Sequence, residues 1–185
     1  FNFLKRGGGI GVMFFFVLSG FLITYIICEE KQQTGQLNLK NFFVRRVLRI
    51  WPLYYLMVAV AYATPYLLSA LGMSASPEGY EPNIWATVFF LENYKMMIEG
   101  THANASPLSV MWSLCIEEHF YIIWGLLLYY INLRSLLKFL YAFIIAGLAG
   151  RVLYVYLNIP TSDILTNIDL FAFGALPAYW LTNNP

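Results

Sequence analysis

The stretch VMWSLCIEEHFYIIWGLLLYYI, from Val110 to Ile131, is long and apolar enough to cross a lipid bilayer, yet Glu117, Glu118 and His119 lie near its middle. A helix needs about 20 residues to span a hydrocarbon core of about 30 Å. On an insertion scale, the ten Leu, Ile, Phe and Val side chains contribute about −3 to −6 kcal/mol, and the two glutamates cost about 5 to 7 kcal/mol. We therefore expect the charged side chains to face other helices or a hydrated cavity.

The composition of the whole chain is that of a membrane protein. Hydrophobic residues make up 59% of the 185 residues and charged residues 11%, against roughly 45–50% and 25% in an average soluble domain. Eleven basic and ten acidic residues leave a net charge of +1, so the balance favours neither nucleic acid nor an acidic partner. The two cysteines, Cys28 and Cys115, lie in apolar runs, and we expect neither a disulfide nor a metal site.

Four apolar runs are long enough to span a membrane as helices. They are Gly9–Cys28, Trp51–Leu71, Val110–Ile131 and Leu136–Leu157. Two shorter runs, Ile84–Ile98 with Glu92 inside and Ile168–Leu181 with Pro177 inside, are expected to be tilted, broken or re-entrant. The pattern predicts an all-α, polytopic membrane helical bundle with about five to six membrane segments, in a single domain over residues 1–185.

Basic residues are concentrated between the first two spans, and they suggest an orientation. The connection Glu29–Ile50 contains Lys31, Lys40, Arg45, Arg46 and Arg49, whereas the connection Gly72–Asn83 contains no base. Because short cytoplasmic loops are enriched in Lys and Arg, the first connection is predicted to be cytoplasmic and the second external. The side on which later segments emerge depends on whether Ile84–Ile98 crosses the membrane.

The basic connection also offers a candidate phosphate site. At 100° per residue, Arg45 and Arg49 share one helix face and Arg46 lies beside them. Guanidinium groups on one face can bind phosphate bidentately. The alternative is an anchor to lipid headgroups, which the sequence alone favours because juxtamembrane bases are common. Trp51-Pro52 fits either interpretation, since Pro is tolerated in the first turn of a helix.

The glycine-rich start of the chain is better explained by structure than by a ligand. No Gly-Lys-Ser/Thr follows the glycines at 7, 8, 9 and 11, so they do not form a phosphate loop. We expect a bend and then a close helix contact there. Ser19 and Gly20 are predicted to supply a further small-residue contact.

Helical spacing sorts the polar residues of Val110–Ile131 into stripes. One stripe holds Ser113, Glu117, Tyr121 and Trp124, and the adjoining one holds Leu114 and Glu118, with His119 pointing away. Ionisable groups inside a membrane are functional by default, so the two glutamates are candidate catalytic residues.

Two structural alternatives stay open for these groups. One glutamate could be the ion-pair partner of an intramembrane base such as Arg151. For His119, a hydrogen-bonded core histidine is the favoured interpretation.

Three ordered motifs resemble the acyltransferase family 3 integral-membrane proteins, which include O-acetyltransferases of bacterial surface polysaccharides, peptidoglycan and Nod factors. They are GIGVMFFFVLSGFLIT (Gly9–Thr24), FFVRRVLRIWPLYY (Phe42–Tyr55) and WSLCIEEHFYIIW (Trp112–Trp124). The stretch NIDLFAFGALPAY (Asn167–Tyr179) resembles the family's later Gly-Ala helix more weakly.

The resemblance implies transfer of an acyl group, most often acetyl, from acyl-CoA to a sugar hydroxyl of a cell-surface polysaccharide, peptidoglycan or glycolipid. The family's Arg-x-x-Arg element matches Arg46 and Arg49, which would hold the CoA donor with Arg45 beside them. The Trp-Ser-Leu…Glu-Glu element matches Glu117 and Glu118 as catalytic residues. It also implies substrate-positioning roles for Trp112, Ser113, His119 and Tyr121. The resemblance implies no metal, a lipid environment and a multi-pass place in the bacterial cytoplasmic membrane.

The chain departs from the family pattern at both ends. Family members have a preceding membrane helix with the histidine usually considered the catalytic base, and neither His102 nor His119 matches it. Helices expected after Pro185 are also missing, so this fragment alone is expected to be inactive. Two other classes stay open: a membrane transporter or lipid-binding protein, and an inactive homologue.

Overall fold

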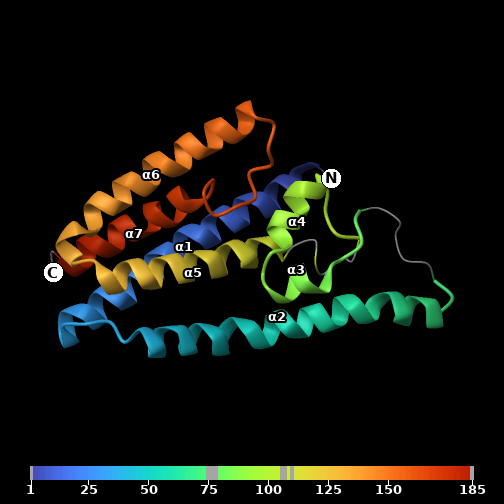
Figure 1. Ribbon diagram of the computed structural model, residues 1–185, viewed down its shortest axis with the longest axis horizontal. Helices are drawn as coiled ribbons and strands as arrows, with labels where there is room; N and C mark the ends of the chain where they lie inside the picture. Colours follow the sequence, from blue (N-terminus) through green and yellow to red (C-terminus); the bar gives the residue numbers. More distant parts are fainter. Residues whose placement is uncertain (1, 74–78, 105–107, 109–110, 184–185) are drawn as a thin grey trace. The chain divides into compact units, whose positions relative to one another are not determined.

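The structure is a computed structural model that describes residues 2–73, 79–104, 108 and 111–183, with side chains from Gly9 onward. Its described residues form seven helices and no strand beyond a single bridge between Tyr80 and Ala103 (Figure 1). The all-α prediction is thus confirmed. The helices are α1 (Asn2–Thr34), α2 (Leu39–Ala70), α3 (Ile84–Val88), α4 (Glu92–Glu99), α5 (Trp112–Tyr130), α6 (Leu133–Tyr156) and α7 (Ile168–Asn183).

The chain is an integral, multi-pass membrane protein, as predicted. Among the described residues, three helices are long and apolar enough to cross a bilayer: Gly9–Thr34 of α1, all of α2 and all of α6. The helix α5 is not among them, because Glu117, Glu118 and His119 interrupt its apolar sequence. Together with α5, α7 and the α3–α4 stretch, these helices are consistent with the predicted five to six membrane segments.

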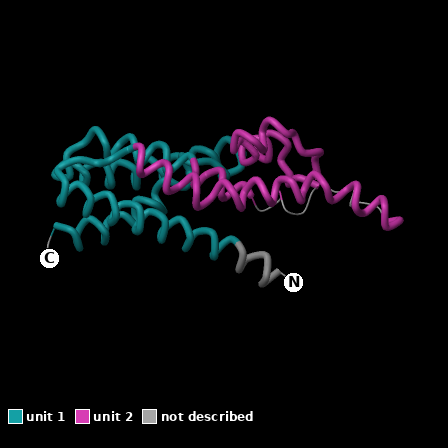
Figure 2. Tube along the Cα trace, turned by 90° about the horizontal axis from the view of Figure 1, so that it is seen from below, with its two compact units in different colours: residues 1–39, 119–185 teal, residues 40–118 magenta. Residues whose placement is uncertain are grey.

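The helices form two compact units, coloured teal and magenta in Figure 2. Unit 1 contains residues 1–39 and 119–185, and unit 2 contains residues 40–118. The helix α5 therefore contributes its first part to unit 2 and the rest to unit 1.

The basic stretch between the first two spans is helical, in agreement with the helix face predicted for Arg45 and Arg49, and α2 therefore begins well before the predicted run Trp51–Leu71. Only residues 35–38 connect α1 to α2, because the alternation of apolar and basic residues after Leu39 has helical period and good helix propensity. Gly35 ends α1 with a φ of 79°, and the Glu30 carboxylate closes the turn by accepting the Asn38 N–H at 2.8 Å. Pro52 consequently lies inside α2 and not in a first turn.

In unit 1, α7 lies between α1 and α6 (Figure 1), and small residues let its backbone approach α1 closely. A Cβ at Gly174 would overlap the Val17 carbonyl, and one at Gly20 would overlap the Phe171 backbone. The predicted contact at Gly20 is confirmed. The predicted contact around the earlier glycines is not found among the described residues, where a methyl group at Gly9 or Gly11 would have no neighbour within 4 Å.

The second part of α5 completes unit 1. The Trp124 indole N–H donates to the Thr24 hydroxyl at 2.8 Å, and the Phe120 ring stacks on Phe171 with centroids 3.9 Å apart. At the end of α1, the Lys31 ammonium donates to the carbonyls of Leu128 and Ile131, both at 2.7 Å. Leu128 lies in the last turn of α5 and Ile131 directly follows the helix, at an end where a helix leaves its acceptors unsatisfied and favours a positive charge.

The two shorter apolar runs differ in structure. The run Ile84–Ile98 is broken into α3 and α4, and Phe90 between them has a φ of 58°. The run Ile168–Leu181 is one continuous helix that passes through Pro177. In unit 2, α3 and α4 lie beside an apolar cluster formed by Tyr54, Val58, Ala61, Tyr80, Phe90, Ala103, Leu108, Met111 and Cys115.

Replacing Gly174 with Ala should destabilise unit 1, because the new methyl group overlaps the Val17 carbonyl. Overpacking of this kind costs about 1–3 kcal/mol. Gly11→Ala is the matched control, since its methyl group meets open space and alanine favours a helix over glycine by about 0.5–1 kcal/mol. Thermal unfolding in detergent measures both variants, and equal melting temperatures would contradict the close contact.

Candidate functional site

The two glutamates of α5 are buried, as their cost in lipid requires. Glu117 is 3% exposed and Glu118 is 8% exposed. Both lie at the end of the part of α5 that belongs to unit 2. Tyr121 and Trp124, further along the stripe predicted for Glu117, are buried too, and so are Cys115, Ile116 and Phe120 on other sides of α5.

The three arginines of α2 have different environments. Arg45 and Arg49 are exposed, in agreement with their predicted common face. Arg46 is 8% exposed, and its guanidinium carbon lies 5.8 Å from the centre of the Phe42 ring. It also interacts electrostatically with Glu118. The family pair Arg46 and Arg49 is therefore divided between a buried position and an exposed one.

The Glu118 carboxylate is surrounded by groups of α2. The Trp51 indole is within hydrogen-bonding range of it, and the Tyr55 hydroxyl is close enough to interact electrostatically. The Trp51 ring is held edge-on to Tyr55 and tilted against Phe90, with centroids 5.8 Å apart in both cases. One buried oxygen, Oε1 of Glu118, accepts no hydrogen bond from the part of the chain that the structure describes. A hydroxyl or a protonated base is the kind of ligand that this oxygen can bind.

The remaining predicted site residues all lie on α5. Trp112 and Ser113 are half-buried and belong to unit 2. His119 is half-buried and Tyr121 is buried, and both belong to unit 1. The cysteines are buried free thiols. No group of three His, Cys, Asp or Glu side chains within the described ranges could hold a metal ion.

Arg151, which was considered as an ion-pair partner for a glutamate of α5, pairs with Asp169 instead. Arg151 of α6 donates from its terminal nitrogen to the Asp169 carboxylate at 2.5 Å, and from Nε to the Thr166 carbonyl at 3.1 Å. Gly147, one turn earlier on α6, leaves the space in which Asp169 packs. The alternative of an Arg151–glutamate pair is therefore wrong. Asp169 stands in the first turn of α7, where a negative charge also suits the helix dipole.

Sequence reasoning treated Glu92 only as an interruption of an apolar run. In the structure it is 1% exposed and accepts hydrogen bonds from the hydroxyls of Tyr80 at 2.5 Å and Thr87 at 3.1 Å. Burial, with a smaller effect of this hydrogen bond, raises the pKa of Tyr80, so the phenol remains a donor. The signal for Glu92 was the same as for Glu117: a carboxylate in a sequence that is otherwise apolar.

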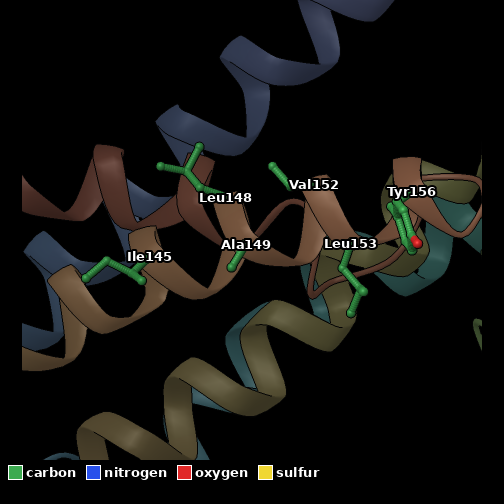
Figure 3. A pocket seen from close by; sticks show the side chains of 6 residues that line it. All are labelled: Ile145, Leu148, Ala149, Val152, Leu153 and Tyr156. Atoms are coloured by element: carbon green, nitrogen blue, oxygen red, sulfur yellow. The ribbon is translucent and has the colours of Figure 1, made fainter.

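A shallow hollow on α6 offers no catalytic group (Figure 3). Six side chains of this one helix line it: Ile145, Leu148, Ala149, Val152, Leu153 and Tyr156. It contains none of the predicted site residues, and an apolar face on a membrane-spanning helix is suited to lipid.

Comparison with known proteins gives a family match over almost the whole chain. A family model described as an acyltransferase domain matches residues 1–184. "Peptidoglycan O-acetyltransferase OatA" of Listeria monocytogenes is 34% identical over 165 residues, which are 85% of this chain and 26% of that protein. "Putative peptidoglycan O-acetyltransferase YrhL" of Bacillus subtilis is 38% identical over 129 residues, which are 66% of this chain and 20% of that protein.

The chain thus spans about a quarter or less of the length of these curated relatives. No solved structure matches it significantly.

Replacing Arg46 with Met should lower the free energy of unfolding by about 1–3 kcal/mol, because the contact of a buried guanidinium with the Phe42 ring and its attraction to Glu118 are lost. Arg45→Met, the exposed neighbour, is the control and should change it by less than about 0.5 kcal/mol. In a double-mutant cycle, Glu118→Gln should recover part of the Arg46→Met loss. Denaturant unfolding in detergent measures these free energies. If Arg46→Met costs as much in the Glu118→Gln protein as in the wild type, the two side chains do not interact.

Proposed function

This chain belongs to the acyltransferase family whose model matches residues 1–184, and from that membership we propose that it is part of a single membrane O-acyltransferase domain. The proposed reaction moves an acyl group, most often acetyl, from acyl-CoA to a sugar hydroxyl of a cell-surface polysaccharide, peptidoglycan or glycolipid. The names of these relatives support O-acetylation, and both OatA and YrhL are named for peptidoglycan. The proposed location is the bacterial cytoplasmic membrane.

The observation that carries this proposal is the burial of Arg46 and Glu118 within the same compact unit, where the two side chains also attract each other electrostatically. Arg46 belongs to α2 and Glu118 to α5, the helices that contain the arginine and glutamate motifs of the proposed reaction. Arg49 presents an exposed guanidinium group on α2, and Arg45 is exposed on the same face. A donor with phosphates and a reactive carbonyl fits an arrangement of exposed cations near buried carboxylates.

The chemistry divides into two demands. The acceptor hydroxyl oxygen attacks the thioester carbonyl, so a C–O bond forms, the C–S bond breaks and the thiolate leaves. A general base must take the hydroxyl proton, and negative charge on the thioester oxygen must be stabilised. The base is expected from the membrane helix that precedes the Gly-Val-Phe-Phe segment in family members.

The roles follow from these demands. Arg46 and Arg49, with Arg45 beside them, hold the CoA phosphates. Glu117 orients the base or the acceptor hydroxyl, and Glu118 is the second catalytic carboxylate, with Oε1 as the acceptor of a hydrogen bond. Substrate positioning is assigned to the nearby residues of α5, which are Trp112, Ser113, His119 and Tyr121.

In the complete protein, Arg46→Ala and Glu117→Gln should each abolish acetylation of the cell surface without loss of expression. Arg46→Ala removes a guanidinium group proposed to bind the CoA phosphates. Glu117→Gln removes the negative charge proposed to orient the base or the acceptor hydroxyl. Glu99→Gln, at an exposed position of α4, is the control and should retain activity. Acetylation that survives in both site variants would overturn the assignment.

Arg49→Ala should weaken binding of the acyl-CoA donor and leave the rate of the chemical step unchanged. Loss of one charge-assisted hydrogen bond to phosphate should raise the KM for acyl-CoA about tenfold, with kcat little changed. Steady-state kinetics on the purified complete protein measure both constants. An unchanged KM for acyl-CoA would place the donor elsewhere.

A further inference from the structure

Glu92 is a buried carboxylate outside the residues assigned to acyl transfer. It begins α4 and is 1% exposed. Its Oε1 accepts from the Tyr80 hydroxyl at 2.5 Å and its Oε2 from the Thr87 hydroxyl at 3.1 Å. Burying a carboxylate is costly unless such donors satisfy it, so each link constrains the residue that supplies it.

These links join stretches that lie far apart in the sequence. On one side, the Tyr54 hydroxyl donates to the Thr87 carbonyl at 2.7 Å, and the Tyr62 hydroxyl lies 3.3 Å from Thr87 Oγ1, so Thr87 is tied to α2. On the other side, the Tyr80 backbone accepts from Asn104 N–H at 3.0 Å, which ties Tyr80 to the stretch after α4. Glu92 is the group that both sides share.

The same network reaches the candidate site. The Tyr55 hydroxyl donates to the carbonyl of Val88, the residue after Thr87, at 3.0 Å. Tyr55 also interacts electrostatically with Glu118. The end of α3 that Glu92 holds through Thr87 is therefore the same end that holds Tyr55 beside Glu118.

The backbone between α3 and α4 carries strain at this place. Phe90 has a φ of 58°, which is unfavourable for an aromatic residue, and its ring stacks on Tyr54 with centroids 4.1 Å apart. Such a strained conformation persists only where the surrounding packing and hydrogen bonds offset its cost, and it is found preferentially at functional sites.

We propose that Glu92 is a positioning residue for acyl transfer, fixing α3 and α4 against α2 so that Tyr55 stays beside Glu118. The inference rests on the proposed function. Glu92 itself touches neither donor nor acceptor and acts through Thr87 and Tyr55. It is therefore expected to affect the chemical step more than donor binding.

Two variants of the complete protein test this role. Glu92→Leu removes both acceptors at similar size, and Tyr80→Phe removes one donor and keeps the ring. Glu92→Leu should lower kcat per folded molecule about tenfold with the KM for acyl-CoA within about twofold, and Tyr80→Phe should lower kcat less. Hydrogen–deuterium exchange should rise in residues 79–104 of both variants. Glu99→Gln, exposed on the same helix, is the control and should change neither readout.

The outcomes separate this inference from the proposed function. A purely stabilising role would reduce the amount of folded protein and leave kcat per folded molecule unchanged in both variants, and that result would overturn the positioning role. If Glu92→Leu does not fold, Tyr80→Phe decides in the same way. Absence of acyl transfer by the unaltered complete protein overturns the proposed function, whereas an active protein whose Glu92→Leu variant keeps a normal kcat overturns only the role of Glu92.

Discussion

The cost of a carboxylate in apolar surroundings is the constraint on which the rest of the structure depends. Three buried acids of the described residues interact with groups that other segments of the chain supply. Asp169 binds Arg151, Glu118 interacts with Arg46, and Glu92 accepts two hydroxyl hydrogen bonds. Because an unsatisfied buried charge would cost several kcal/mol, each partner fixes which helices pack together.

Small residues and polar links have complementary effects in this chain. In unit 1, Gly20 and Gly174 allow two backbones to come close, which gives dispersion contacts where no hydrophobic effect operates between helix and lipid. In unit 2, hydroxyl groups bind the carbonyls at the broken end of α3, where backbone would otherwise be unsatisfied. This membrane chain thus uses glycines where two helices pack closely, and it uses tyrosine hydroxyls to satisfy the carbonyls where a helix is broken.

Local periodicity was enough to predict the main helices and which polar side chains of α5 share a stripe, because side-chain direction within one helix follows from 100° per residue. It also placed Arg45 and Arg49 on a common exposed face. It could not predict which base pairs with which acid, since Arg151 and Asp169 meet only after two helices pack. The role of Glu92 was missed for the same reason: its donors lie before and within α3.

The end of α1 has a consequence for the order of events during synthesis. Lys31 binds carbonyls 97 and 100 residues later in the chain, and Gln32 binds the Thr182 carbonyl 150 residues later. At a translation rate of about 5–20 residues per second, these partners emerge roughly 5–30 s after α1 has been made. Until then the polar groups at this end of α1 must remain hydrated at the membrane surface. Although α1 precedes the other described helices in the sequence, it is therefore among the last of them to reach its final set of contacts.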